Sequence, residues 1–369
     1  MKIDRIEIRH IKMHLIAPFE TSFGVETDEE HIIVRVDAEG VTGWGESPVG
    51  VGPYYSYETT QTAWHVLRDF LVPAVLGRDI ASVDDAVRLC ERVRGHNMAK
   101  AGLESALWDA FAKARGESLA QALGGTRDRI RVGVSVGIQS SPEALVERVG
   151  RYLRDGYGRI KVKIAPGRDI AFVSAVRKSY PDILLQVDAN SAYTLDDVAI
   201  LRALDAFNLL LIEQPLGYDD IYAHSKLQRE LKTPICLDES IHTLADAQAA
   251  LELGSCRIIN IKPARVGGYS ESKRIHDLCA QHNVPVWHGG MLESGIGRAG
   301  NVALAALPNF TLPGDISASK RYFLEDIVEP EFEVASDGTM AVPTKPGIGV
   351  DVRKERLEQV TVRREEFRT

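Results

Sequence analysis

The sequence predicts an α/β protein in which a (β/α)8-type barrel, a modified TIM barrel, carries an N-terminal α+β capping domain. Five charged residues close short apolar runs at intervals of 25, 25, 25 and 24 residues: Lys163, Asp188, Glu213, Asp238 and Lys262. An interval of this size holds one strand, one helix and two loops. The carboxyl ends of parallel barrel strands face one cavity, so we expect these five side chains in a single site.

Residues 1–125 show no such repeat and predict the capping domain. Residues 3–15 and 30–47 alternate like strands, with a turn at residues 38–40. The polar segments 16–30 and 47–59 are expected to be loops. Residues 97–115 have helical spacing of apolar side chains, and Gly116 is placed to end that helix.

Residues 126–324 alternate between short apolar strands and helical segments, which is typical of a parallel sheet covered by helices. Eight strands are expected, the last of them weaker, at 130–138, 158–164, 183–189, 209–215, 234–240, 257–263, 284–290 and 310–316. Eight units favour a closed barrel over an open sheet, because no phosphate-binding G-x-G-x-x-G follows the first strand. Residues 325–369 lose the pattern, and their extended Pro/Gly-rich part is expected to return to the capping domain.

Composition is that of a soluble globular enzyme, with 44% hydrophobic and 26% charged residues. A net charge of −8 without blocks of like charge argues against nucleic acid or an anionic membrane as partner. The N-terminus lacks the apolar core of a signal peptide, and no apolar run is long enough to span a membrane. The four scattered cysteines fit buried free thiols, and a cytoplasmic location is expected.

Asp188, Glu213 and Asp238 are expected to project from the third, fourth and fifth strands. Hard oxygen ligands on rigid strands suit Mg²⁺, with Mn²⁺ as an alternative, and the lack of His or Cys disfavours zinc. A single acid at a strand end can instead cap the following helix, as Asp238 could. Three such acids in consecutive units favour the metal site.

The lysines predict acid/base chemistry on either side of that metal. Lys161 and Lys163 are two residues apart on one strand and face the same side, so we expect one of their pKa values to fall. Lys262 lies on the sixth strand, across the barrel, and Arg265 three residues later could lower its pKa. A lysine with a lowered pKa is a competent general base.

This combination predicts abstraction of an α-proton next to a carboxylate. A metal that coordinates the carboxylate neutralises the developing enediolate, and a lysine takes the proton. A second lysine on the opposite face could return the proton, which would give racemisation. If the β-carbon carried a leaving group, the same enediolate could expel it.

Five motifs resemble those of the enolase superfamily and its muconate-lactonizing subgroup, over the whole chain: K-x-K at 161–163, D-x-N at 188–190, E-Q-P at 213–215, D-E-S at 238–240 and Lys262 in NIKPARVGG. Within it, segments such as VDANSAYTLDD, KPARVGGYSES and HGGMLESGIGRAGN are similar to the family of o-succinylbenzoate synthases and N-succinylamino acid racemases, also called N-acylamino acid racemases. The resemblance implies a small-molecule carboxylate substrate, a homo-oligomer, and racemisation or the dehydration step of menaquinone biosynthesis, or both.

The resemblance also implies residue roles. Asp188, Glu213 and Asp238 would bind the metal, Lys163 and Lys262 would be the acid/base pair, and Lys161 would hold the substrate carboxylate. Arg265 resembles the arginine associated with racemase activity, and with Asn190 and Glu239 it would lie behind the first layer of the site. Ser135, Gly290, Met291 and Glu293 are expected to line the acyl end of the pocket, and Phe19, Ser22, Phe23 and Gly50 the cap loops. Gly50 stands where a bulkier apolar residue would be expected, so the acyl pocket could be reshaped.

Several alternatives stay open. Dipeptide epimerases share the ladder but typically carry D-x-D at the eighth strand, where this chain has Asp315-Ile316-Ser317. Muconate cycloisomerase shares the lysines. His288 could be a base as in mandelate racemase, although pocket lining or core is favoured because it has no obvious Asp partner. Two alternatives belong to other classes of protein. A Schiff-base aldolase barrel is disfavoured by the three acids at the strand ends, and a non-catalytic metal-binding barrel by the presence of Lys163 and Lys262.

Overall fold

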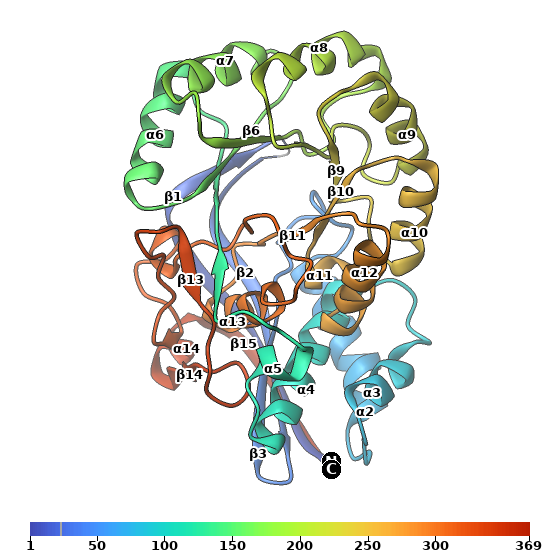
Figure 1. Ribbon diagram of the computed structural model, residues 1–369. Helices are drawn as coiled ribbons and strands as arrows, with labels where there is room; N and C mark the ends of the chain where they lie inside the picture. Colours follow the sequence, from blue (N-terminus) through green and yellow to red (C-terminus); the bar gives the residue numbers. More distant parts are fainter. Residues whose placement is uncertain (23) are drawn as a thin grey trace.

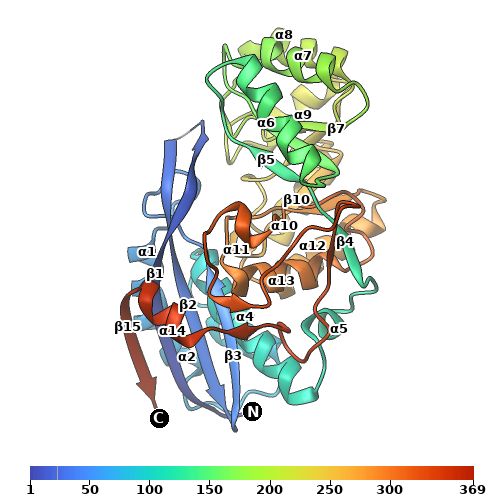
Figure 2. The same ribbon diagram turned by 90° about the vertical axis from the view of Figure 1, so that its left-hand side faces the viewer.

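An antiparallel sheet forms the base of the capping part. In the computed structural model, which describes residues 1–22 and 24–369, its four strands lie in the order β15-β1-β2-β3. They comprise β1 (Ile3–Thr21), β2 (Gly24–Ala38), β3 (Val41–Ser47) and β15 (Thr361–Arg368). The predicted turn lies at Glu39 and Gly40, which both have positive φ. Strand β15 runs beside β1, so the end of the chain completes this sheet, as expected (Figure 2).

The prediction of a loop over residues 16–30 is wrong. Strands β1 and β2 continue as a long hairpin, in which Phe19 pairs with Glu26 and Thr21 with Gly24. A register shift between His14 and Phe19 bends β1 on the way. Figure 2 shows this hairpin rising from the cap alongside the barrel. The polar residues of this segment do not show the apolar/polar alternation that predicts a strand.

Helices pack on the sheet and continue to the barrel: α1 (Thr60–Val66), a π-helical turn (Leu67–Leu71), α2 (Val72–Val75), α3 (Val83–Cys90), α4 (Asn97–Arg115) and α5 (Leu119–Leu123). The predicted long helix is α4, and it ends at Gly116 in the left-handed conformation, as expected. Its first turn is capped by the Glu58 carboxylate, which accepts hydrogen bonds from the amides of Met98 (2.8 Å) and Ala99 (3.0 Å).

The second part is a curled parallel sheet of seven strands in sequence order from β5 to β11. Its strands are β5 (Val134–Val136), β6 (Arg159–Lys163), β7 (Leu184–Asp188), β8 (Ile212–Glu213), β9 (Ile235–Leu237), β10 (Ile258–Ile261) and β11 (Val286–His288). The α-helices that follow them are α6 (Pro142–Arg154), α7 (Ile170–Ser179), α8 (Val198–Ala203), α9 (Ile221–Glu230), α10 (Leu244–Leu253), α11 (Pro263–Val266), α12 (Tyr269–Gln281) and α13 (Gly295–Ala305). Short 3-10 turns lie at Leu195–Asp197, Leu204–Phe207 and Ser319–Arg321. Figure 1 shows α6 to α10 as an outer arc around the strands.

The expected eighth strand is not a regular strand. Residues 310–314 instead join both edges of the sheet by isolated bridges, Phe310 to Val286 and Gly314 to Val132. Pro313 has no amide hydrogen to donate, which limits this segment to scattered bonds. The Gly133 amide still donates to the Gly314 carbonyl at 2.7 Å, so the segment closes the ring. The predicted α/β fold with a capping part is therefore confirmed, with one strand fewer than expected.

The remaining elements are β4 (Arg129–Arg131), β12 (Val328–Glu329), β13 (Thr339–Ala341), β14 (Asp351–Val352) and α14 (Lys354–Val360). Strand β13 pairs with β4, which ties the C-terminal segment to the start of the barrel part before it reaches the cap. Strand β14 pairs with β12 within the C-terminal segment itself. The four cysteines are free and buried, as expected. Within residues 1–22 and 24–369, no helix is long and apolar enough to cross a membrane.

Candidate active site

The five charged residues of the ladder come together at one edge of the parallel sheet. Lys163 is in register with Asp188, and Asp188 with Glu213, on neighbouring strands β6, β7 and β8. Asp238 and Lys262 directly follow β9 and β10. The three acids are at most 1% exposed. The spacing in the sequence therefore reports a real convergence in space.

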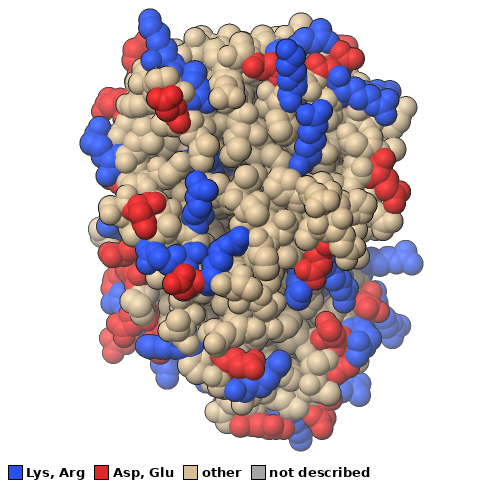
Figure 3. All heavy atoms as spheres, in the orientation of Figure 1, with Lys and Arg blue, Asp and Glu red and all other residues tan. Residues whose placement is uncertain are grey.

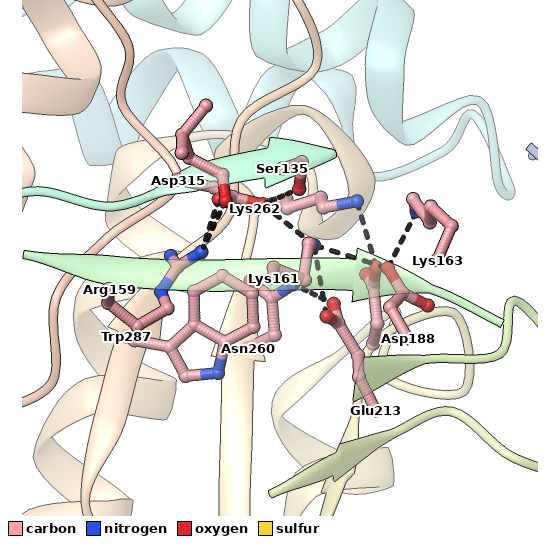
Figure 4. A network of polar contacts seen from close by, with 12 residues as sticks. Ser135, Arg159, Lys161, Lys163, Asp188, Glu213, Asn260, Lys262, Trp287 and Asp315 are labelled. Atoms are coloured by element: carbon pink, nitrogen blue, oxygen red, sulfur yellow. Dashed lines mark hydrogen bonds and ion pairs between the residues drawn. The ribbon is translucent and has the colours of Figure 1, made fainter. Parts of the chain in front are cut away.

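Lys161 lies at the centre of this cluster (Figure 4). Its Nζ contacts Asp188 Oδ2 at 3.1 Å, Glu213 Oε2 at 3.0 Å and Asp315 Oδ2 at 2.7 Å. Its ammonium also lies 5.0 Å from the centre of the Trp287 ring. Burial lowers the pKa of Lys161, but the three carboxylates outweigh burial and raise that pKa well above its ordinary value. The expected fall in pKa is therefore wrong for Lys161, because three acids surround it and not only a second lysine.

Lys163 lies nearer the open side of the same strand. Its Nζ contacts Asp188 Oδ2 at 2.6 Å and Asn190 Oδ1 at 2.5 Å. Asn190 also donates to Glu239 Oε1 at 2.7 Å. Burial raises the pKa of Asp188, but Lys163 and Lys161 outweigh it and hold that pKa below its ordinary value. Asn190 and Glu239 thus lie behind Lys163 and fix its position.

A second ion cluster surrounds Asp238. Lys262 Nζ lies 2.8 Å from Asp238 Oδ2, and Arg265 pairs with Oδ1 of the same carboxylate. Burial raises the pKa of Asp238, but Lys262 and Arg265 lower it below its ordinary value. Burial lowers the pKa of Lys262, but the charge of Asp238 raises it, and the pKa of Lys262 lies above its ordinary value. Arg265 therefore does not lower the pKa of Lys262 overall, contrary to our expectation.

Tyr55 closes this cluster from the capping part. Its hydroxyl accepts from Lys262 Nζ at 3.0 Å and donates to Asp238 Oδ1 at 2.9 Å. Burial and the Asp238 charge raise the pKa of Tyr55, so the phenol stays protonated. The sequence did not single out Tyr55, because the 47–59 segment has no periodicity that sets one of its aromatic residues apart.

Asp315 is a second residue whose role the sequence did not reveal. It accepts from Ser135 Oγ (Oδ2, 2.7 Å) and Arg159 (Oδ1, 2.7 Å) in addition to its contact with Lys161. In the sequence Asp315 stands out only as a single acid in place of D-x-D. Its position on the segment that closes the barrel makes it the counter-ion of two buried cations.

Part of these clusters, including Tyr55 and Asp315, lines a cavity of about 470 Å³ between the β1–β2 hairpin, the 48–58 segment and the strand ends. The three ladder acids are not among the residues of its wall. Of the predicted pocket residues, the structure places Phe19, Gly50, Ser135, Gly290 and Met291 in its wall, together with Lys161, Lys163 and Lys262. Glu293 does not line it; its carboxylate turns to the Met291 amide (2.9 Å) and supports the loop from behind. Ser22 donates to the Asn190 carbonyl at 3.1 Å, and Phe23 lies outside the described residues.

His288 lies in the core and is fully buried beside Phe310, with 6.0 Å between ring centres. Burial, reinforced by the charge of Lys262, lowers its pKa to about 3. The ring is therefore neutral near pH 7 and packs against Phe310, which agrees with the interpretation of His288 as core.

The acids present a suitable donor set for a divalent cation. Burial is the largest cause that raises the pKa of Glu213. The charges of Asp188 and Asp238 raise it further, because the three carboxylates repel one another. A cation of charge two relieves such repulsion, and buried oxygen donors suit hard cations. In the described part of the chain no three acidic, His or Cys groups are already gathered around one point. The lysine ammonium groups lie among the acids and would have to withdraw from them.

Comparison with known proteins connects this site to a family. Residues 5–124 match the N-terminal domain family of mandelate racemase and muconate lactonizing enzyme. Residues 144–356 match the enolase C-terminal domain-like family.

Related proteins match over nearly the full chain. An o-succinylbenzoate synthase from Geobacillus kaustophilus is 52% identical over 98% of this chain and 96% of the relative. An N-succinylamino acid racemase from an Amycolatopsis species is 50% identical over 98% of both chains. The crystal structure of an enolase superfamily member from Listeria innocua has a TM-score of 0.96 and 45% identity, and the match covers 100% of this chain and 99% of that one.

Proposed function

The chain belongs to the mandelate racemase and muconate lactonizing enzyme family of the enolase superfamily, and from that premise we propose that it racemises N-succinylamino acids or related N-acylamino acids. The chain is an enzyme, as its relatives are. The observation that carries the proposal is the pair of lysines, Lys163 and Lys262, which line one cavity at the two ends of a buried row of acids.

Members of this superfamily generally bind a divalent metal, and we propose Mg²⁺, with Mn²⁺ as a substitute, held by Asp188, Glu213 and Asp238. The bound cation would neutralise the charge that develops on the substrate carboxylate when the α-carbon loses a proton. Each acid now contacts a lysine or lies beside one. A cation on the same oxygens would release Lys262 from the carboxylate that raises its pKa.

We propose that Lys163 and Lys262 exchange one proton with the α-carbon from two sides. One lysine removes the proton and the other returns a proton to the opposite face, which inverts the centre. Lys161 stays charged because Asp315 and two ladder acids surround it, so it can hold the substrate carboxylate. Tyr55 and Arg265 keep Asp238 and Lys262 in position.

The same site could also form o-succinylbenzoate, the activity named for the Geobacillus relative. Loss of the α-proton and then of a β-leaving group needs the same residues. The proposal therefore includes a dehydratase role in menaquinone biosynthesis in the cytoplasm. Arg265, which the family resemblance associates with racemase activity, supports including racemisation. A dipeptide epimerase is less well supported, because Asp315 is already paired with Arg159 and Lys161.

Purified protein should be assayed for racemisation of N-succinylamino acids by polarimetry and for o-succinylbenzoate formation by absorbance. We expect racemisation, its loss after EDTA treatment and its return with Mg²⁺. Activity that survives EDTA and is trapped by borohydride would favour a Schiff-base aldolase instead. A complete lack of α-proton exchange in D₂O with any N-acylamino acid would contradict the proposal.

A further inference from the structure

The wall of the cavity carries acidic side chains that the chemistry above does not use. The β1–β2 hairpin contributes four of them: Glu26, Asp28, Glu29 and Glu30. In a cavity that binds a carboxylate substrate, as proposed above, the negative charges of these acids repel the negative charge of the substrate. The three active-site lysines in the same wall already pair with Asp315 and the ladder acids, so the hairpin acids call for a further positive charge.

Two of these acids are already neutralised by the protein. Lys12 lies 3.6 Å from Asp28 and 3.5 Å from Glu30. His10 and His14 also contact them, with His10 at 2.8 Å from Glu30 and His14 at 3.1 Å from Asp28. Asp28 and Glu30 thus have partners within the hairpin.

Glu29 and Glu26 are short of positive charge. His31 is the cation beside Glu29, at 3.3 Å, but it binds Glu46 more closely, at 2.6 Å. Within the described part of the chain, no cation lies within ion-pair distance of Glu26. One imidazolium therefore serves a group of three carboxylates.

An unpartnered oxygen marks the position. Glu29 is 7% exposed, and its buried Oε1 accepts no hydrogen bond from the residues that the structure describes. Glu26 lies next to it, within hydrogen-bonding reach. Burial, with Glu29 as the next cause, raises the pKa of Glu26 to about 7. Leaving a buried polar atom without a partner costs free energy, which a ligand donor could offset.

The pair lies within reach of the reacting centre. The charge of Lys163 acts on Glu26, and the hairpin tip is held over the end of β7 by the Ser22 hydrogen bond to Asn190. Apolar side chains border the same cavity, and each is more than half exposed: Val25, Val51 and Tyr54. A ligand with its α-carbon at Lys163 could therefore lay an apolar stem on these residues and place its end group at the acids.

We infer that Glu26 and Glu29 bind the positively charged end of the substrate side chain, so that the preferred substrates are N-acylamino acids with a basic side chain, such as those of lysine or arginine. This inference rests on the proposed racemase function. The ammonium or guanidinium group would donate hydrogen bonds to both carboxylates, and charge-assisted bonds of this kind are strong. A neutral side chain of equal length would leave Glu29 Oε1 unsatisfied.

The test compares substrates that differ only in that charge. N-succinyl-lysine is paired with N-succinyl-norleucine, and N-succinyl-arginine with N-succinyl-citrulline. For the wild-type protein we expect kcat/KM for racemisation to favour each basic member about tenfold or more. Glu26→Gln and Glu29→Gln should each lower that ratio. Glu20→Gln, a change on the same hairpin to an acid that contacts Arg168 and does not line the cavity, should keep the wild-type ratio.

The outcomes separate this inference from the proposed function. Racemisation of the norleucine and lysine derivatives at equal kcat/KM would overturn the inference and leave the function standing. A preference for lysine that survives both variants would also overturn it. Titration calorimetry with the same four compounds gives a readout that does not need turnover. Preferential binding of the basic compounds without racemisation would support the cation subsite and contradict the racemase.

Discussion

Lys161 and Lys163 lie two positions apart on β6, yet their ammonium groups meet different surroundings. Lys161 is enclosed by three carboxylates and the face of Trp287. Lys163 contacts one ladder acid and the amide of Asn190, and it is more exposed. The first is therefore a fixed positive charge, and the second is held at the cavity wall, where it can reach a substrate and exchange a proton with it.

At this scale the sharpest test is to remove each proposed base. Lys163→Ala and Lys262→Ala should each abolish racemisation, by a factor of at least ~10², because inversion needs a proton donor on both faces. Each variant should still exchange the α-proton of one enantiomer in D₂O, detected by NMR. The surface change Lys178→Ala is the matched control and should behave as wild type. If either active-site variant racemises at the wild-type rate, the two-base assignment is wrong.

The ladder could be predicted from sequence because each member lies at the end of the strand of a βα unit, and units of equal length place their strand ends side by side. Tyr55 and Asp315 could not be predicted in the same way. Tyr55 comes from a segment without periodicity, and Asp315 from the irregular closing segment. The pKa direction of Lys161 depended on Asp315, so it could not be judged from the K-x-K motif alone.

At the scale of elements, α4 packs directly on β3 in the cap. A Cβ atom at Gly45 would lie 2.3 Å from the Gly102 carbonyl oxygen, and one at Gly43 2.1 Å from that of Ala106. Glycine therefore allows the helix backbone to rest directly on the strand. The packing role of these two glycines is visible only once α4 is placed against β3.

Gly45→Ala should destabilise the protein by ~1–3 kcal/mol, because the helix would have to move away from β3. Urea unfolding followed by circular dichroism measures the change. Gly158→Ala is the control, since a Cβ there meets nothing closer than 4.0 Å, and we expect little change. Equal stability of Gly45→Ala and wild type would show that α4 is not held at this distance.

Over the whole molecule, a buried carboxylate joins the cap to the barrel. Glu46 on β3 accepts from the amides of Ser294 (2.9 Å) and Gly297 (2.8 Å) at the start of α13. A negative charge at a helix N-terminus is stabilising. Partners about 250 positions apart leave no local pattern, so the sequence predicted both parts but not this contact between them.

Acidic and basic side chains intermingle on the face seen in Figure 3, so no single-sign charged surface competes with the cavity as a candidate site there.

His31 completes this connection, and its protonation makes it dependent on pH. Burial lowers the pKa of His31, but Glu29 and Glu46 outweigh burial and raise it to about 10 from an ordinary 6.5. Because the folded-state pKa is the higher one, the stabilisation is complete below pH 6.5 and is lost as pH rises toward 10. Burial raises the pKa of Glu46, but His31 lowers it below its ordinary value of 4.5. The ion pair is therefore intact between the acid range and the pKa of His31.

His31→Asn should therefore lower the free energy of unfolding by about 3 kcal/mol at pH 6, because a buried pair loses one partner. The difference from wild type should shrink steadily between pH 6.5 and 10, since the wild-type imidazolium is itself lost there. Denaturant titrations at several pH values measure it. His14→Asn, which removes a largely exposed histidine beside Asp28, is the control and should cost at most about 1 kcal/mol throughout. A difference for His31→Asn that stays constant or grows with pH would show that His31 is not held as a cation between the cap and the barrel.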